Sequence, residues 1–270
     1  MSAGDIGTGN AAVLPRARIS AAIRNPQVAG EPAIVAFMTA GYPSAELFRT
    51  HLAAVAAGAD VVEIGVPFTD PMADGVTIQR SSQAALQQGV SLRWILAELR
   101  AMQRPAAPLI LMSYLNPLLN YGYARLATDA AAAGVCGFIV PDLPFDEGEE
   151  LRAALDATGV ALVQMVTPVT LEVRLAQICA ASQGFVYAVT MTGTTGKSVD
   201  VPESVLDYLE NVRQVAAPLP VCAGFGIRSR AQVERLRGHV DGVIVGSALV
   251  EVLERGDDPT TWLRTLRAGA

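Results

Sequence analysis

Val61-Val62-Glu63-Ile64-Gly65-Val66-Pro67-Phe68-Thr69-Asp70-Pro71-Met72-Ala73-Asp74-Gly75 is the stretch around which the chain is organised. Residues 61–65 have the β-branched, apolar composition of a buried strand, and the glycines and prolines that follow are typical of a loop. Burying the Glu63 carboxylate costs on the order of several kcal/mol unless it is paired or protonated. Such a residue is tolerated where its altered acidity is useful, although an acid that reaches solvent at a strand end is the plain alternative.

The succession of a short apolar strand, a loop and a helix recurs along the chain. Eight strands are predicted in this way, at residues 33–41, 60–65, 109–114, 137–140, 161–166, 185–189, 219–223 and 242–245. Strands that are apolar throughout are typical of a parallel sheet covered by helices. Eight such units in roughly 250 residues predict a (β/α)8 TIM barrel of the α/β class, with a doubly wound sheet as the alternative.

Helices beyond the eight of the repeating pattern are expected at three places. One precedes the first strand, near residues 19–25, and extra helices follow the second and eighth strands. Residues 1–16 are small and polar without periodicity, and they are expected to form a flexible N-terminal tail. No linker or break in composition divides the remainder, so residues 17–270 are predicted to form a single TIM-barrel catalytic domain.

Several residues mark where the predicted helices begin. Ser44 and Asp200 can cap the helices that follow the first and sixth strands. Ser229 and Gln232 have the spacing of a capping box for the helix after the seventh strand. Asn116-Pro117 is expected to end the third strand, with the next helix beginning only after it.

The composition excludes several classes of function. The 270 residues carry a net charge of -6 with acidic and basic residues interspersed, so no face for nucleic acid is predicted. No apolar run approaches the roughly 20 residues of a membrane helix. Met1 to Asn10 lack the apolar core of a secretory signal, and a cytoplasmic protein is therefore expected.

The scarce residue types limit the possible chemistry. Cys136, Cys179 and Cys222 each lie alone in apolar surroundings, as free thiols do in a reducing cytosol. The chain has two histidines and a single lysine, Lys197, without the clustered Cys/His spacing of a metal site. No metal is therefore expected, and a mechanism that needs a histidine pair or a lysine must use these few residues.

In a barrel of this kind the active site lies in the loops that follow the strands. Phosphate sites form after strands seven and eight from backbone N–H groups and a helix N-terminus, and glycine permits close approach of the backbone to the anion. The residues expected to bind phosphate on this basis are Gly226, Gly246 and Ser247, and Gly196, in the loop after strand six, is expected to add a third wall. Each glycine alone would also fit an ordinary turn.

An apolar pocket between an acid and a phosphate site suits a flat apolar ligand with a phosphorylated tail. The strands and loops supply large side chains that are expected to line such a pocket at the barrel mouth. They are Phe37, Met112, Tyr114, Ile139, Tyr187 and Phe225. The packing of an ordinary barrel core would account for some of these side chains.

Four segments resemble the tryptophan synthase alpha subunit family in order and spacing. The longest and most specific is residues 63–75 of the opening stretch. The others are Leu111-Met112-Ser113-Tyr114-Leu115-Asn116-Pro117, Pro141-Asp142-Leu143-Pro144 and Gly224-Phe225-Gly226-Ile227. The resemblance covers roughly residues 19–265 and implies an enzyme that cleaves indole-3-glycerol phosphate to indole and D-glyceraldehyde 3-phosphate, a retro-aldol reaction.

The resemblance also implies roles for individual residues. Glu63 would be the main acid and base, protonating indole C3 and helping to deprotonate the side-chain hydroxyl. Asp74 would hold the indole N1 proton, with Tyr187 in the pocket near Glu63. Thr195, in the loop after strand six, would position Asp74 when that loop closes over substrate. The residues themselves agree, because burial should raise the pKa of Glu63 while Asp74, in a polar loop, stays ionised.

The resemblance further implies a partner, a beta subunit that uses pyridoxal phosphate and receives indole through a tunnel in an alpha2beta2 heterotetramer. Asp70, Pro71 and Asn116 match surfaces that meet this subunit. No cofactor is expected in the present chain, since nothing in its sequence suggests that it binds pyridoxal phosphate. The expected role is one step of L-tryptophan biosynthesis.

Other functions fit parts of the sequence. A Schiff-base aldolase needs a lysine at the carbonyl carbon, and Lys197 lies in a Gly/Thr loop rather than on a strand. A metal-dependent aldolase would need ligands that the barrel mouth lacks. A phosphosugar isomerase would account for the phosphate loops but not for the loop with Asp70 and Asp74. A non-catalytic regulatory subunit that binds a phosphorylated ligand would not need Glu63 and Asp74.

Overall fold

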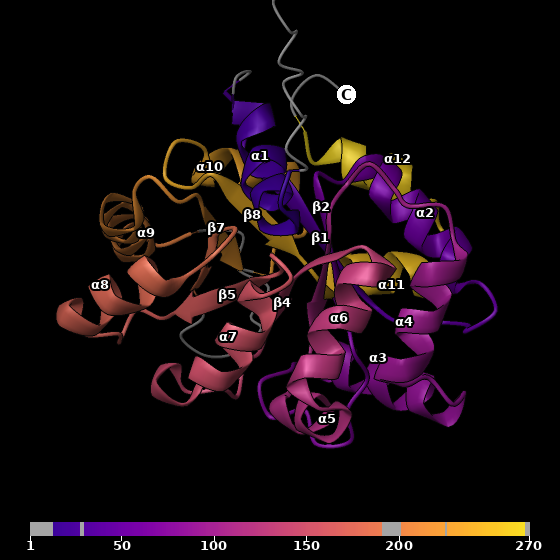
Figure 1. Cartoon of the computed structure of the whole chain (residues 1–270). Coiled ribbons are helices and arrows are strands. Elements are labelled where there is room, and N and C mark those ends of the chain that lie inside the picture. The colour runs from indigo at the N-terminus through magenta and orange to yellow at the C-terminus, as the bar shows by residue number, and fades with distance from the viewer. Residues whose placement is uncertain (1–12, 28–29, 191–200, 225, 268–270) are drawn as a thin grey trace, which may run out of the picture.

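The computed structural model describes residues 13–27, 30–190, 201–224 and 226–267. In these residues eight parallel strands form a closed barrel in chain order (Figure 1). The strands are β1 (Ala33–Thr39), β2 (Val61–Gly65), β3 (Leu109–Met112), β4 (Val135–Ile139), β5 (Ala161–Val166), β6 (Val186–Val189), β7 (Val221–Gly224) and β8 (Gly242–Val245). The barrel closes between β1 and β8, where Val35 is in register with Ile244. The predicted TIM barrel is confirmed, and a doubly wound sheet is excluded because such a sheet is open.

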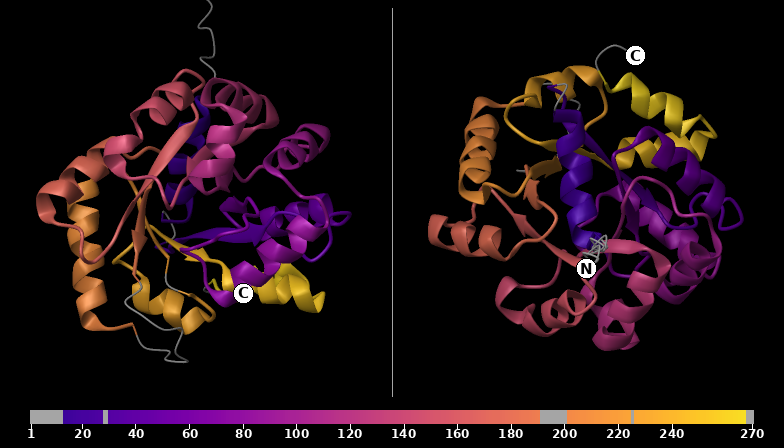
Figure 2. Two further views of the ribbon diagram at one scale, coloured as in Figure 1. Left: turned by 90° about the horizontal axis from the view of Figure 1, so that it is seen from below. Right: turned by 45° about the horizontal axis from the view of Figure 1, so that its top comes forward.

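Helices surround this barrel and fill most connections between strands (Figures 1 and 2). They are α2 (Phe48–Gly58), α3 (Val76–Gln87), α4 (Leu92–Ala101), α5 (Leu115–Tyr121), α6 (Tyr123–Ala133), α7 (Glu149–Asp156), α8 (Glu172–Ala181), α9 (Glu203–Ala216), α10 (Arg230–Leu236), α11 (Ser247–Arg255) and α12 (Pro259–Thr265), with a 3-10 turn η1 (Phe145–Glu147). The extra helices predicted after β2 and β8 are present. Among the helices of the described residues, none is long and apolar enough to cross a membrane.

The helix α1 (Pro15–Gln27) closes the end of the barrel where the strands begin. Figure 2 shows it lying across that end in the right-hand view. Ile19 and Ile23 are fully buried in the cluster of side chains that fills the barrel interior. A Cβ atom on Gly137 of β4 would lie 3.1 Å from the end of the Ile19 side chain, so glycine allows the helix to pack closely. The opposite end of the barrel, with the loops that follow the strands, remains for a site.

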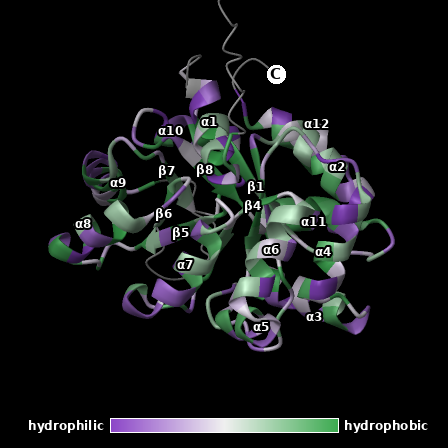
Figure 3. Ribbon diagram, viewed as in Figure 1, coloured by the Kyte–Doolittle hydropathy of each residue, from purple (hydrophilic) through white to green (hydrophobic). Residues whose placement is uncertain are grey.

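Side-chain alternation along the strands divides the core into two layers. Inward positions such as Val61 and Ile110 form the interior cluster. Outward positions such as Ile64 and Phe138 form a larger cluster beneath the surrounding helices. Figure 3 shows the same division, with hydrophobic strands at the centre and hydrophilic residues on the outer helix faces.

Two helices begin later in the chain than their predicted caps indicated. The helix α2 begins at Phe48 rather than near Ser44, and the Gln88 side chain binds the intervening segment by accepting a hydrogen bond from the Ala45 amide at 2.9 Å. The helix α9 begins at Glu203, and Asp200 lies outside the described residues. The capping box of α10 is confirmed.

The short helix α5 was not predicted, and it contains the Asn116-Pro117 pair that was expected to act as a break. A proline in the first turn of a helix loses no internal hydrogen bond, because the first amides of a helix have no partner within it. The first amide of this helix, that of Leu115, donates to the Asp142 carboxylate at 2.8 Å. A side chain from the loop after β4 therefore supports a helix that local sequence alone does not indicate.

Candidate active site

Glu63 lies at the centre of β2 and belongs to its inner face. Val61, two residues earlier on the same strand, is part of the interior cluster, whereas the adjacent Ile64 packs beneath the outer helices. In the barrel register Glu63 is opposite Phe37 of β1 and Ile110 of β3. Only 1% of its surface is exposed, so the plain alternative of an acid that reaches solvent does not hold.

The Glu63 carboxyl group is suited to carrying a proton at neutral pH. Burial penalises its charged form, and the negative charge of nearby Asp74 adds to this effect, so that the pKa of Glu63 is raised to about 8. Its Oε2 atom has no hydrogen-bond partner among the described residues. Because a buried polar oxygen is normally paired, this atom is a candidate for contact with a bound ligand.

Asp74 is held by Tyr114, which follows β3. The Tyr114 hydroxyl accepts a hydrogen bond from the Ala73 amide at 2.9 Å and donates one to Asp74 Oδ2 at 3.2 Å. Burial raises the pKa of Asp74, and the Tyr114 hydrogen bond opposes that rise. The sequence placed this carboxylate in a polar loop, but the structure half-buries it, and Tyr114 is the contact that favours its charged form.

A small pocket opens between the ends of β1, β2 and β3 and helix α3. It is lined by Phe37, Thr39, Gly65, Val66, Pro67, Asp74, Ile78, Ser82, Met112 and Tyr114. Three of the predicted pocket residues, Phe37, Met112 and Tyr114, are therefore in its wall. Ile139 is not among these lining residues; it is fully buried in the interior cluster, beside Met112 in the barrel register.

Tyr187 of β6 lies near both candidate acids. Burial, and then the negative charges of Glu63 and Asp74, raise the pKa of its hydroxyl well above the ordinary value. A Cβ atom on Gly224 of β7 would lie 2.6 Å from the Tyr187 hydroxyl oxygen. The missing side chain at Gly224 therefore lets the tyrosine ring lie against β7 at the barrel mouth.

The predicted phosphate residues follow two neighbouring strands, since β7 and β8 pair directly. Gly226 has a φ of +60°, which a residue with a side chain adopts only with strain. Gly246 is the N-cap of α11 and Ser247 its first residue, and no side chain caps this helix. Its first amides are therefore available to an anion, and the helix dipole favours negative charge there.

Three predicted site residues, Thr195, Gly196 and Phe225, lie outside the described residues. Within the part of the chain that is described, no group of three or more His, Cys, Asp or Glu side chains is placed to hold a metal ion.

The predicted partner residues follow β2 and β3, at the end of the barrel where the pocket opens. Asp70 and Pro71 are in the loop after β2, and Met72 and Val76 next to them are 86% and 80% exposed. Asn116 of α5 lines a surface groove together with Pro67, which belongs to the same loop. Large exposed apolar side chains at one place are typical of an interaction surface.

Thr39, Ile78 and Ser82 also line the pocket and were not predicted as site residues. The Ser82 hydroxyl accepts a hydrogen bond from the Phe68 amide at 2.8 Å, so it joins α3 to the loop after β2. Ile78 and Ser82 are four residues apart and thus share one helix face. This spacing, in a helix that begins directly after Asp74 and Gly75, is the signal that could have identified them.

Comparison with known proteins adds to this geometry. The family model for the tryptophan synthase alpha chain matches residues 23–268. A tryptophan synthase alpha chain of Nitratidesulfovibrio vulgaris (strain DP4) is 47% identical over 249 residues, covering 92% of this chain and 96% of the relative. One from Carboxydothermus hydrogenoformans is 44% identical over 230 residues, covering 83% and 85%.

Solved structures agree with the sequence comparison. A chain of M. tuberculosis tryptophan synthase in its aminoacrylate-bound form superposes with a TM-score of 0.83 at 34% identity, covering 92% of this chain and 97% of that one. The tryptophan synthase A-subunit of Pyrococcus furiosus gives 0.79 at 33% identity, covering 87% and 97%. With the family model matching nearly the whole barrel, the chain belongs to the tryptophan synthase alpha chain family.

Proposed function

We propose that the chain cleaves indole-3-glycerol phosphate to indole and D-glyceraldehyde 3-phosphate by a retro-aldol reaction. The observation that carries this proposal is the state of Glu63, a buried carboxyl group on the inner face of the barrel with a pKa of about 8. A carboxylic acid that keeps its proton at neutral pH can donate it to carbon. Membership in the tryptophan synthase alpha chain family supports the same reaction.

In the proposed mechanism Glu63 carries out two proton transfers, one to indole C3 and one from the side-chain hydroxyl of the substrate. The protonated acid donates to indole C3, which places positive charge on the ring and weakens the bond from C3 to the glycerol side chain. The Glu63 carboxylate then takes the proton of the adjacent side-chain hydroxyl as that bond breaks, and the bonding electrons restore the aromatic ring. Indole and the aldehyde leave, and Glu63 is protonated again, so the proton balance closes.

Asp74 is proposed to stabilise the positive charge that forms at the indole nitrogen. Its carboxylate would accept the N1 hydrogen bond, which strengthens as the ring becomes cationic and therefore favours the transition state over the ground state. The Tyr114 hydrogen bond supports this role because it favours the charged form of Asp74 and fixes its position. Thr195 is proposed to add a further contact to Asp74.

The remaining site residues are proposed to hold the two ends of the substrate. The apolar wall against the indole ring comprises Phe37, Met112, Tyr114, Ile139, Tyr187 and Phe225. The phosphate would bind to backbone amides of Gly196, Gly226 and Gly246 and to the amide and hydroxyl of Ser247. The uncapped N-terminus of α11 supports this placement.

We further propose that the product indole passes to a tryptophan synthase beta subunit in an alpha2beta2 heterotetramer. Pyridoxal phosphate would belong to that partner, and the present chain would need no cofactor for its own reaction. Asp70, Pro71 and Asn116 are the proposed contact residues, and the exposed side chains of Met72 and Val76 support this surface. We also propose a cytoplasmic location, which the three buried, free cysteines support.

An indole-release assay with indole-3-glycerol phosphate tests the proposal on the isolated chain, with and without a beta subunit. Wild-type chain should release indole, and Glu63→Gln, which keeps the side-chain shape, should lower the rate by roughly 10²- to 10⁴-fold. Wild-type chain that releases no indole even with a beta subunit would refute the reaction. A Glu63→Gln variant with near wild-type turnover would refute the assignment of the acid.

Further measurements on the same purified chain distinguish the proposed reaction from the alternative functions. Borohydride added with substrate would trap a covalent adduct on Lys197 in a Schiff-base aldolase, and we expect no adduct here. A phosphosugar isomerase would interconvert a sugar phosphate without releasing indole. A non-catalytic regulatory subunit would bind the phosphorylated ligand and leave it intact.

A further inference from the structure

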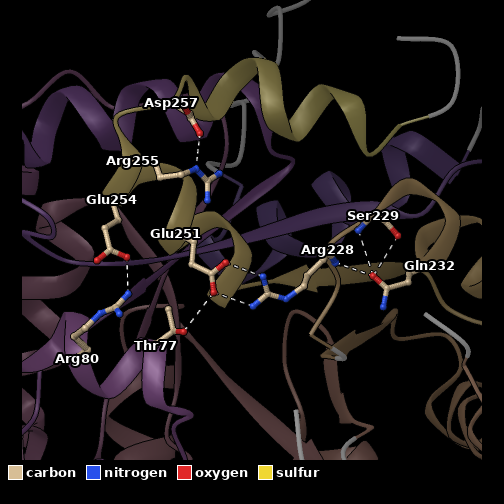
Figure 4. A network of polar contacts seen from close by, with 9 residues as sticks. All are labelled: Thr77, Arg80, Arg228, Ser229, Gln232, Glu251, Glu254, Arg255 and Asp257. Carbon is tan, nitrogen blue, oxygen red and sulfur yellow. Dashed lines mark hydrogen bonds and ion pairs between the residues drawn. The ribbon is translucent and has the colours of Figure 1, made fainter. Parts of the chain in front are cut away.

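A bidentate ion pair lies beside the proposed phosphate site and has no part in the reaction described above. Arg228, two residues after Gly226, places both terminal nitrogens on Glu251 of α11, with Nη1–Oε2 at 2.7 Å and Nη2–Oε1 at 2.9 Å (Figure 4). Glu251 lies four residues, about one helical turn, after Ser247. Thr77 of α3 adds a longer hydrogen bond to Glu251 Oε1 at 3.5 Å.

The backbone of Arg228 is fixed independently of this ion pair. Its amide donates to the Gln232 side chain at 2.8 Å, and the Ser229 amide donates to the same oxygen at 3.2 Å (Figure 4). Gln232 is itself buried. The capping box of α10 therefore holds the loop after β7 in place, and the contribution of Glu251 is to determine where the Arg228 side chain points.

The Arg228 side chain is free to take another position if Glu251 loses its charge. It is 54% exposed, against 29% for Glu251, so little packing restrains it. Two residues of chain span at most about 7 Å, which brings a phosphate on the Gly226 amide within reach of an extended arginine side chain. Guanidinium groups bind phosphate in the same forked geometry in which they bind carboxylate.

We propose that Glu251 sets the affinity of the site for phosphate by holding Arg228 away from it. This inference rests on the proposed phosphate site after β7 and β8. With Arg228 bound to Glu251, the phosphate is held by backbone amides and the Ser247 hydroxyl, and the phosphorylated product can leave. Glu251 is thus a positioning residue that acts through Arg228.

Two other roles for the pair predict different results. If the pair only braced the loop, removing either partner would weaken phosphate binding. If Glu251 acted only by repelling phosphate through its charge, Glu251→Gln would tighten binding whether or not Arg228 is present. In the proposed role, tightening requires the arginine.

The test measures binding of inorganic phosphate and D-glyceraldehyde 3-phosphate to the full chain by calorimetry. We expect Glu251→Gln to tighten both ligands by about two- to tenfold, the range of one partly exposed charge-assisted contact. Arg228→Gln should not tighten either ligand, and the double variant should bind like Arg228→Gln. Glu251→Ala provides a second variant that removes the charge.

Glu254→Gln is the matched control. Glu254 lies on α11 like Glu251, about one turn further from Ser247, and pairs with Arg80 of α3 at 2.5 Å (Figure 4). Its replacement removes an equivalent ion pair and should leave phosphate affinity unchanged. A similar tightening in Glu254→Gln would show that net charge alone changes binding, and the inference would be wrong.

The outcomes also separate this inference from the proposed function. Wild-type chain that neither binds these phosphates nor releases indole would overturn the proposed function. Wild-type chain that does both, with Glu251→Gln binding no tighter, would overturn the inference alone. Equal tightening by Glu251→Gln in the wild-type and Arg228→Gln backgrounds would overturn it as well.

Discussion

The Tyr114 hydroxyl donates a hydrogen bond to Asp74 Oδ2 at 3.2 Å. The Tyr114 hydroxyl oxygen also accepts a hydrogen bond from the Ala73 amide at 2.9 Å. One hydroxyl group therefore fixes both the backbone and the carboxylate of the loop after β2. The tyrosine ring in turn stacks on Phe68, with centroids 5.0 Å apart. The end of the pocket assigned to the indole nitrogen is therefore positioned by the residue that follows β3.

Replacing Tyr114 with phenylalanine tests this relationship. Loss of the hydroxyl leaves the Ala73 amide without its partner and removes the bond that favours charged Asp74, so the pKa of Asp74 should rise further. We expect kcat/KM for indole release to fall about tenfold, corresponding to roughly 1 to 2 kcal/mol, with the acidic limb of the pH profile moved to higher pH.

Tyr121→Phe is the control for this variant. The Tyr121 hydroxyl donates to Asp129 Oδ2 at 2.7 Å, which is the same type of bond on the outer helices. Its loss should lower the midpoint of urea unfolding slightly and leave kcat/KM of the isolated chain unchanged. Equal kcat/KM values for Tyr114→Phe and wild type would show that Tyr114 does not position Asp74.

The raised pKa of Glu63 also predicts how activity depends on pH. If protonated Glu63 supplies the proton to indole C3, kcat/KM should fall as pH rises through about 8, where the acid loses its proton. The measurement is indole release from about pH 6 to pH 10, with circular dichroism to verify that the fold persists. A profile that stays flat through pH 8 would contradict the assignment of Glu63 as the proton donor.

Stability should depend on pH through the same residue. The folded-state pKa of Glu63, about 8, is above the ordinary value of 4.5, so the folded state binds the proton more tightly than the unfolded state. The free energy of unfolding should therefore fall as pH rises from about 4.5 to 8, by at most about 1.4 kcal/mol per pH unit from this group. Above pH 8 both states are deprotonated and the slope from Glu63 should vanish.

The variant Glu63→Gln isolates this contribution. Its unfolding free energy, measured in urea at a series of pH values, should increase relative to wild type across the same interval, because glutamine does not ionise. If the difference in unfolding free energy between the variant and wild type stayed constant from pH 5 to pH 8, the folded-state pKa of Glu63 would not be raised.

Gly65 at the end of β2 should be intolerant of a side chain. A Cβ atom there would lie 2.5 Å from Phe37 Cζ, so Gly65→Ala must displace the ring that lines the pocket. We expect a loss of about 1 to 3 kcal/mol in unfolding free energy and a raised KM.

Replacing Phe37 with a smaller residue should relieve the clash that Gly65→Ala creates. Addition of Phe37→Leu to that variant removes the ring atoms and should recover part of the lost stability, measured by thermal unfolding. If the double variant were as unstable as the sum of the two single variants, direct contact between these positions would not be the cause.

Much of the barrel was predictable from the sequence because its signals are local. The strand β5 has the predicted bounds, and β8 does as well, since continuous apolar runs between turn residues specify buried parallel strands. The phosphate residues proposed after β7 and β8 rest on strand order and stay a prediction. The helix α5 was not predictable, because the contact from Asp142 that supports its first amide comes from another loop.

Within the opening stretch, the sequence by itself determined that Glu63 lies in an apolar strand on the same face as Val61, because alternation along a strand is a property of the backbone. Closure of the barrel decided that this face is the buried, inner one. The sequence did not determine the state of Asp74. That depends on Tyr114, 40 residues further along the chain, and on the burial that closing the barrel imposes. The pairing of Arg228 with Glu251, 23 residues apart, was likewise decided only by tertiary structure. Hydrogen bonds and pKa values follow from which groups lie within a few ångström of each other, and the folded chain alone brings these groups together.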